Sequence, residues 1–90
     1  MVRYHITVTG LVQGVGFRYF VYHSASKSGL TGWIRNCYDD SVELEVQGEI
    51  KSLDKFITEL RRGNGFSEVE NIISAVIDIK ENEKSFRITY

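Results

Sequence analysis

The 90-residue sequence contains no proline, only one cysteine and no long apolar run. Without proline, prolyl isomerisation cannot add a slow phase to refolding. The single Cys37 excludes an internal disulfide and suits a reducing compartment, so we expect a cytoplasmic protein. No segment approaches the ~20 apolar residues that a membrane-spanning helix needs. The first residues enter a strand pattern at once, which predicts that there is no signal peptide.

An excess of charge of either sign is also absent. Eleven basic and twelve acidic residues leave a net charge of −1, and the basic residues are scattered along the chain. Such a surface has no strong field for nucleic acid or for an anionic membrane, so we expect neither as a partner. The spacing of the two histidines and the cysteine matches no metal site, and we expect no metal or other cofactor.

The length of the chain predicts one domain over residues 1–90, and nothing in the sequence requires more than a monomer. Apolar residues that alternate with polar ones predict strands at residues 4–8, 31–38, 42–46, 73–79 and 86–90. Helical spacing predicts one helix at residues 17–28 and a second one that Ser52 caps and Gly63 ends. The order β-α-β-β-α-β with a short C-terminal strand predicts an α+β ferredoxin-like sandwich, in which two helices cover one face of a mainly antiparallel sheet.

Glycines gather where the first strand should end and the first helix should begin, in the stretch Gly-Leu-Val-Gln-Gly-Val-Gly-Phe-Arg at residues 10–18. A glycine backbone turns tightly and approaches a ligand closely because it has no Cβ. The start of a helix adds unpaired N–H groups and the positive end of the helix dipole. Arginine adds a permanent, planar cation beside them. We therefore predict a phosphate-binding cradle formed by Gly14, Val15, Gly16, Phe17 and Arg18.

Other glycine-containing motifs fit this stretch poorly. The third glycine of the dinucleotide-binding fingerprint is missing, and no Gly-Lys-Ser/Thr follows as it would in a nucleotide P-loop. The aromatic RNA-binding signature of the RRM fails at Gln13, Val15 and Arg18. A nucleic-acid-binding module of ferredoxin-like fold is therefore disfavoured, in agreement with the balanced charge.

A second stretch, Gly-Leu-Thr-Gly-Trp-Ile-Arg-Asn at residues 29–36, follows one predicted helix later. Together the two stretches resemble the paired signatures of the acylphosphatase family, Gly-x-Val-Gln-Gly-Val-x-Phe-Arg and then Gly-Trp-Val/Ile-x-Asn. The resemblance covers nearly the whole chain and extends to the final Phe-x-Ile-x-Tyr at residues 86–90. It implies the ferredoxin-like fold and an enzyme that hydrolyses small acyl phosphates, such as acetyl phosphate, carbamoyl phosphate or 1,3-bisphosphoglycerate, to a carboxylate and inorganic phosphate.

The resemblance also implies roles for two side chains: Arg18 binds the phosphate and Asn36 orients the attacking water. The leaving carboxylate has a conjugate-acid pKa of roughly 4 and departs without a proton, so the reaction needs no general acid. An asparagine amide can accept a hydrogen bond from water and donate one to the substrate. The two stretches contain no serine, histidine or carboxylate, and we expect neither a phosphoenzyme intermediate nor a metal requirement.

One alternative function stays open at this point. Domains similar to acylphosphatases also occur inside larger hydrogenase-maturation proteins that handle carbamoyl phosphate. Under this alternative, the chain is a module that handles carbamoyl phosphate or binds phosphate and has no turnover of its own.

Two positions depart from the family pattern, and the role of a third, Arg35, follows from its place on a strand. Asp40 stands where the family usually has glycine in the hairpin turn at residues 37–41, which predicts another turn type or local strain. Asn64 stands where a proline is common, which predicts a more mobile loop. Arg35 is next to Asn36 on a predicted strand, so the two side chains should face opposite sides. We therefore expect Arg35 to be a solvated or paired surface residue and not a second phosphate ligand.

Overall fold

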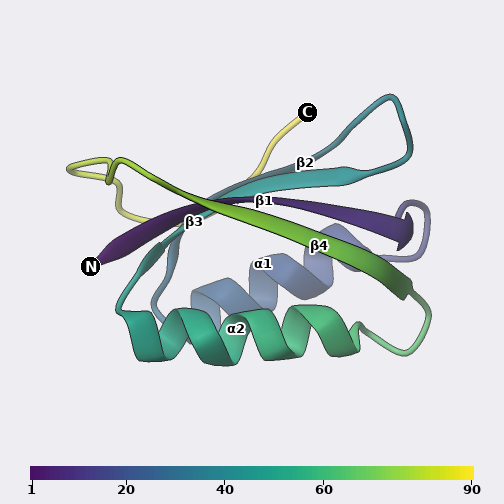
Figure 1. The fold of residues 1–90 in the computed structure, drawn as a ribbon, viewed down its shortest axis with the longest axis horizontal. Helices are drawn as coiled ribbons and strands as arrows, with labels where there is room; N and C mark the ends of the chain where they lie inside the picture. Colours follow the sequence, from purple (N-terminus) through teal and green to yellow (C-terminus); the bar gives the residue numbers. More distant parts are fainter.

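The computed structural model describes residues 1–90 as one sheet with both helices packed on the same face (Figure 1). Along the chain the elements are β1 (Val2–Leu11), α1 (Phe17–Lys27), β2 (Thr31–Asn36), β3 (Val42–Gly48), α2 (Ile50–Arg62), β4 (Glu68–Ile77) and β5 (Phe86–Ile88). This order and layering confirm the predicted ferredoxin-like sandwich with a short C-terminal strand.

The sheet has the strand order β4-β1-β3-β2-β5. β1 pairs antiparallel with β3 and β4, and β2 pairs antiparallel with β3, whereas β5 runs parallel to β2 at one edge. The sheet is therefore mainly antiparallel, as predicted. Val42 at the start of β3 is opposite both Val8 of β1 and Asn36 of β2. This register brings the loop after β1 and the end of β2 to the same end of the sheet.

The hydrophobic core lies between the sheet and the two helices. Its fifteen buried residues include Ile6, Val8, Leu44 and Val46 from the strands and Phe17, Val21, Leu53 and Phe56 from the helices. Burying one such side chain stabilises the folded state by ~1.5–3 kcal/mol. Phe17 is the first residue of α1 and is only 1% exposed, so core packing fixes the N-terminal end of this helix against the sheet.

Several element ends differ from the sequence prediction. Ser52 does not cap α2, because the helix begins at Ile50 and Glu49 occupies the N-cap position in an extended conformation. The N–H of Leu53 donates to the Glu49 carbonyl at 3.0 Å, so the chain turns into the helix directly after β3. β4 begins at Glu68 instead of residue 73, because β1 extends to Leu11 and supplies backbone partners to the whole longer strand. β2 ends at residue 36 instead of 38 and β5 at residue 88 instead of 90.

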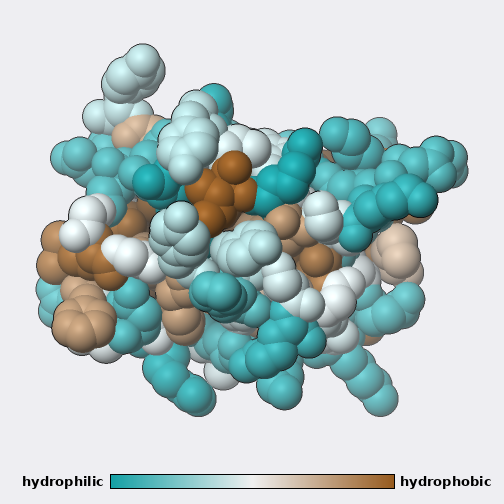
Figure 2. Space-filling view, turned by 180° about the vertical axis from the view of Figure 1, so that it is seen from behind, coloured by the Kyte–Doolittle hydropathy of each residue, from teal (hydrophilic) through white to brown (hydrophobic).

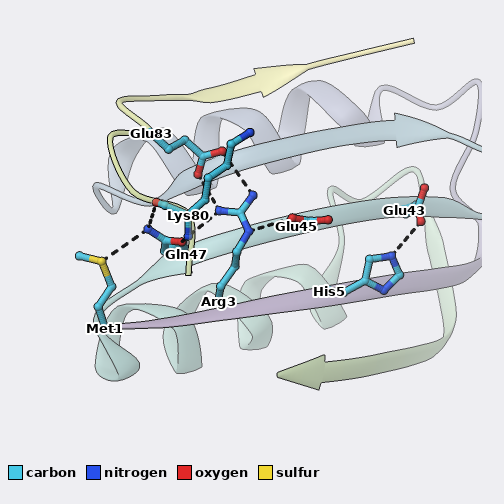
Figure 3. Close-up of polar contacts among 8 residues, drawn as sticks. All are labelled: Met1, Arg3, His5, Glu43, Glu45, Gln47, Lys80 and Glu83. Atoms are coloured by element: carbon cyan, nitrogen blue, oxygen red, sulfur yellow. Dashed lines mark hydrogen bonds and ion pairs between the residues drawn. The ribbon is translucent and has the colours of Figure 1, made fainter. Parts of the chain in front are cut away.

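The face of the sheet that the helices leave uncovered carries charged and polar side chains, several of which pair with one another (Figure 3). Seen from behind, the surface is mostly hydrophilic, and hydrophobic residues reach it in patches separated by polar side chains (Figure 2). Neither helix has the length and apolar character that a membrane crossing requires.

Candidate active site

The loop between β1 and α1 has the backbone geometry of an anion cradle. Gly14 and Gly16 adopt positive φ angles of 73° and 76°, in the left-handed region that glycine enters without steric cost. Gly16 is the N-cap residue of α1, and no side chain caps the helix there. The first N–H groups of a helix have no partner within the helix, so those at the start of α1 are free to bind a ligand.

A small hollow of about 100 Å³ lies against this loop. Its lining residues are Val12, Gly14, Gly16, Phe17, Arg18, Tyr19 and Asn36. The structure therefore brings together five of the six residues that the sequence singled out, from two segments that a whole helix separates. The sixth, Val15, does not line the hollow, and its side chain packs partly buried against the core.

The Asn36 side chain, which lines this hollow, carries an unsatisfied polar atom. Its Oδ1 is buried and has no hydrogen-bond partner within the protein. A buried acceptor left unpaired in this way costs about 1–3 kcal/mol, so most folded proteins satisfy such groups. The position of Asn36 at the last residue of β2 directs the amide to the end of the sheet, where the β1–α1 loop lies. The amide is thus available for a ligand or water in the hollow.

Arg18 shares this availability. None of the four ion pairs in the protein includes it. Its guanidinium carbon lies 5.2 Å from the centroid of the Tyr90 ring, a distance typical of a cation–π contact. Such a contact orients the planar group without using its N–H donors, which remain able to bind two oxygens of an anion.

Gln13 joins the two segments of the site, a role that the sequence analysis missed. Its Nε2 donates to the backbone carbonyls of Cys37 and Ser41, both at 2.8 Å. These carbonyls belong to the β2–β3 hairpin that follows Asn36. One side-chain amide therefore sets the spacing between the glycine loop and the hairpin. The sequence analysis recognised Gln13 only as part of the motif at residues 10–18. Neighbouring residues do not indicate which distant carbonyls its side chain reaches.

Asn64 fastens the cradle through hydrogen bonds that the sequence analysis did not foresee when it predicted a more mobile loop. Its Nδ2 donates to the Val15 carbonyl at 2.9 Å. Its Oδ1 accepts hydrogen bonds from the N–H groups of Phe66 and Ser67 at 3.0 and 2.9 Å. The side chain thus closes its own turn and fastens the glycine loop, which a proline at this position could not do because it has no side-chain amide.

A larger hollow of about 500 Å³ adjoins the cradle, since Arg18 and Asn36 line both. The rest of its lining is Arg35, Cys37, Tyr38 and Tyr90. Arg35 is paired, as expected, and its Nε donates to Glu43 Oε1 at 2.7 Å. Hydrogen bonds from His5 and from Arg35 lower the pKa of the Glu43 carboxyl, against the opposing effect of burial, and keep it ionised.

The protein contains no group of three or more His, Cys, Asp or Glu side chains that could hold a metal ion.

The hairpin turn after β2 is strained at Asp40. The sequence analysis predicted either such strain or another turn type at this position. Asp40 adopts a positive φ of 70°, a conformation that costs energy for a residue with a Cβ. Asp39 stabilises the same turn, because its Oδ1 accepts hydrogen bonds from the Ser41 N–H at 3.1 Å and the Ser41 hydroxyl at 2.5 Å. These hydrogen bonds, first that of the hydroxyl, lower the pKa of the Asp39 carboxyl.

Comparisons with known proteins agree with this site. The acylphosphatase family model matches residues 4–88. An acylphosphatase from Clostridium acetobutylicum is 51% identical over 90 residues, which are 100% of this chain and 99% of that protein. One from Geobacillus kaustophilus is 47% identical, over 100% of this chain and 96% of that protein.

Solved structures give the same result. The crystal structure of acylphosphatase from Bacillus subtilis superposes with a TM-score of 0.95 at 40% identity and covers 100% of both chains. The crystal structure of HypF from T. kodakarensis matches with a TM-score of 0.87 at 32% identity, but this chain covers only 12% of that much longer one. The match over residues 4–88, together with the full-length identity to curated acylphosphatases, shows that this chain belongs to the acylphosphatase family.

Proposed function

We propose that this acylphosphatase holds the phosphate group of its substrate with Arg18 and the backbone N–H groups of residues 14–18, and that Asn36 orients the attacking water. The observation that carries the proposal is the buried Asn36 Oδ1, which has no protein partner and lines the same hollow as Arg18 and the two glycines. An acceptor at that position binds a water O–H, and the amide Nδ2 donates to the substrate.

The reaction needs only these parts. The water oxygen attacks phosphorus in line with the bond to the acyl oxygen, and that bond breaks to release the carboxylate. The proton that the water loses passes to the phosphate formed. Most of the catalytic task is to stabilise charge on the phosphoryl oxygens and to position the water. Preorganised N–H groups and a guanidinium do this without a covalent intermediate and without a metal.

The proposal includes the setting in which the enzyme acts. Its substrates are small acyl phosphates, and the protein works as a monomer in the cytoplasm. A single core of fifteen buried residues supports one domain over residues 1–90. A binding module without turnover is not favoured, because the curated relatives that match over their full length are named acylphosphatases.

Asn36→Ala is the test of the water-positioning role. We expect its turnover of benzoyl phosphate to fall by ~10²-fold. Binding of inorganic phosphate, measured by isothermal titration calorimetry, should stay near the wild-type value, because Arg18 and the cradle remain. Arg61→Ala, on the exposed face of the last turn of α2, is the matched control and should change neither quantity.

Three results would overturn these assignments. Near wild-type turnover by Asn36→Ala would remove its role with water. A phosphorylated side chain trapped during turnover, or activity lost to a chelator, would contradict the direct, metal-free attack.

A further inference from the structure

The larger hollow adjoins the phosphate cradle and offers space for the acyl part of a bound substrate. Arg18 and Asn36 line both this hollow and the small cradle, so a phosphate held in the cradle directs its acyl group into the larger space. The side chains that line this space include two arginines and no carboxylate. A positive lining of this kind suits an acyl group that carries negative charge of its own.

The guanidinium of Arg35 is held in place beside the larger hollow, but not all of its N–H donors have protein partners. Its Nε donates to Glu43 Oε1 at 2.7 Å, and its guanidinium carbon lies 5.8 Å from the centroid of the Trp33 ring. The other oxygen of Glu43 contacts His5 Nε2 at 2.8 Å (Figure 3), so this carboxylate is shared between two partners. No protein group accepts from the terminal nitrogens of Arg35, whose side chain is 49% exposed. The guanidinium is therefore held in place while its terminal N–H donors face solvent.

The surrounding charge favours an anion at this position. A neighbouring hollow on the uncovered face is lined by Arg35 and Arg87 together with Trp33 and Thr89. Glu43 is the only carboxylate that pairs with Arg35. Arg18 and Arg35 thus line the space beyond the phosphate cradle, and Arg87 lines the hollow next to it. A guanidinium with free terminal donors binds a carboxylate or phosphate through two parallel hydrogen bonds.

We propose that Arg35 binds a second anionic group on the acyl part of the substrate. The preferred substrates are then acyl phosphates that carry a carboxylate or a phosphate group away from the reacting bond. Glu43 acts as a positioning residue, since it holds the Arg35 Nε. This inference rests on the proposed function, because it assumes that the phosphate to be cleaved occupies the cradle next to Arg18 and Asn36.

The test compares two substrates of similar length, succinyl phosphate with a distal carboxylate and butyryl phosphate without one. We expect the wild-type kcat/KM for succinyl phosphate to exceed that for butyryl phosphate about fivefold, the upper end for a charge pair in an exposed setting. The ratio should fall as salt is added. Arg35→Gln should bring the ratio close to unity, mainly through KM for succinyl phosphate. Arg35→Lys keeps the positive charge but loses the two parallel N–H donors of the guanidinium, so it should retain part of the preference for succinyl phosphate. Arg61→Gln, the control, should leave the preference unchanged.

Each outcome decides something. The inference is overturned if the wild-type ratio of the two kcat/KM values is near unity. It is also overturned if Arg35→Gln leaves that ratio unchanged. The first measurement uses the wild-type protein alone and does not depend on whether a variant folds. If the wild-type enzyme hydrolyses neither substrate, the proposed function itself fails. Turnover of butyryl phosphate without a preference for succinyl phosphate therefore separates failure of the inference from failure of the proposed function.

Discussion

Two arginines at opposite ends of the sheet each stand near a side-chain amide, yet their surroundings differ completely. Arg3 at the start of β1 is near Gln47 of β3, and Arg18 at the start of α1 is near Asn36 of β2. Arg3 is 2% exposed, and its Nε and both terminal nitrogens bind protein acceptors. Arg18 enters no ion pair, and the Oδ1 of Asn36 is buried without a partner.

The contacts of Arg3 fasten one loop to the sheet (Figure 3). Arg3 Nε binds Glu45 at 2.8 Å, and its terminal nitrogens bind both oxygens of Glu83 at 2.8 and 3.3 Å. Gln47 accepts from the Lys80 N–H at 2.7 Å and donates to the Lys80 carbonyl at 3.0 Å. The loop between β4 and β5 is thus held by polar groups that find most of their hydrogen-bond partners within the protein.

The difference shows how the same residue types serve stability or chemistry. Polar groups that the protein satisfies fix a conformation, and truncating one leaves a partner unpaired. Polar groups that the protein leaves unsatisfied raise the energy of the folded state, but they remain available for a ligand. We therefore expect variants at the Arg3 end to change stability and variants at the Arg18 end to change turnover.

Arg18→Met should have the largest effect, and it should weaken phosphate binding and turnover without lowering stability. Loss of the main cation of the cradle is expected to lower kcat/KM for benzoyl phosphate by ~10³-fold. The melting temperature should stay close to that of the wild type, because Arg18 has no ion-pair partner to leave unpaired. Steady-state kinetics and thermal unfolding measure the two quantities. A large loss of stability would break the comparison, since it would mean that the cradle arginine also supports the fold.

Arg3→Met should show the reverse pattern. It leaves Glu83, with a side chain only 6% exposed, without its guanidinium partner. Breaking one side of a buried ion pair costs about 3 kcal/mol, measurable as a lower free energy of unfolding in urea. Turnover at a temperature where the variant is folded should match the wild type. Adding Glu83→Leu to this variant should recover part of the stability, because the uncompensated charge is then removed. No recovery would mean that packing, and not charge, is the main contribution of Arg3.

Low pH should reduce the stability that the contacts of Arg3 provide, because Glu83 becomes protonated. Burial opposes ionisation of this carboxyl, but hydrogen bonds from Arg3 and Thr31 and the charge of Arg3 outweigh it and lower its pKa below the ordinary 4.5. A carboxylate with a lowered pKa in the folded state contributes stability above the unfolded-state pKa. That contribution is lost as the pH falls below 4.5 and through the folded-state value. Urea unfolding at about pH 6 and about pH 3.5 measures the loss, which should be smaller in Arg3→Met.

The smallest expected effect concerns one strained residue at each end. Asp40 in the hairpin after β2 and Asn82 in the loop after β4 adopt φ angles of 70° and 66°. Glycine removes the steric cost of this conformation but adds backbone entropy to the unfolded chain. Asp40→Gly and Asn82→Gly should therefore each stabilise the fold by ~0.5 kcal/mol, measured by urea unfolding. Destabilisation by either substitution would show that the side chain compensates for its own strain.

Much of the fold could be predicted because its signals are local. Alternation at Tyr4, Ile6 and Val8 identified β1, and helical spacing at Phe17 and Val21 identified α1. Element ends were predicted less well. Ser52 is a good N-cap residue by type, but the chain turns into α2 three residues earlier, at Glu49, because β3 ends directly before it. The register with β1, and not the pattern within residues 68–72, sets the start of β4.

The sequence by itself determined the two segments of the site and the residue types in them, because the turn that glycine permits before α1 depends mainly on neighbouring residues. Only the tertiary structure decided which polar groups meet. Arg3 and Glu83 are 80 residues apart along the chain, and Asn64 and Val15 are 49 apart. Such pairs form when packing of the core brings distant strands and loops together, and no local pattern records them. For the same physical reason, two arginines that look alike in the sequence differ in the fold: Arg3 binds protein acceptors through all three of its nitrogens, and Arg18 enters no ion pair at the phosphate cradle.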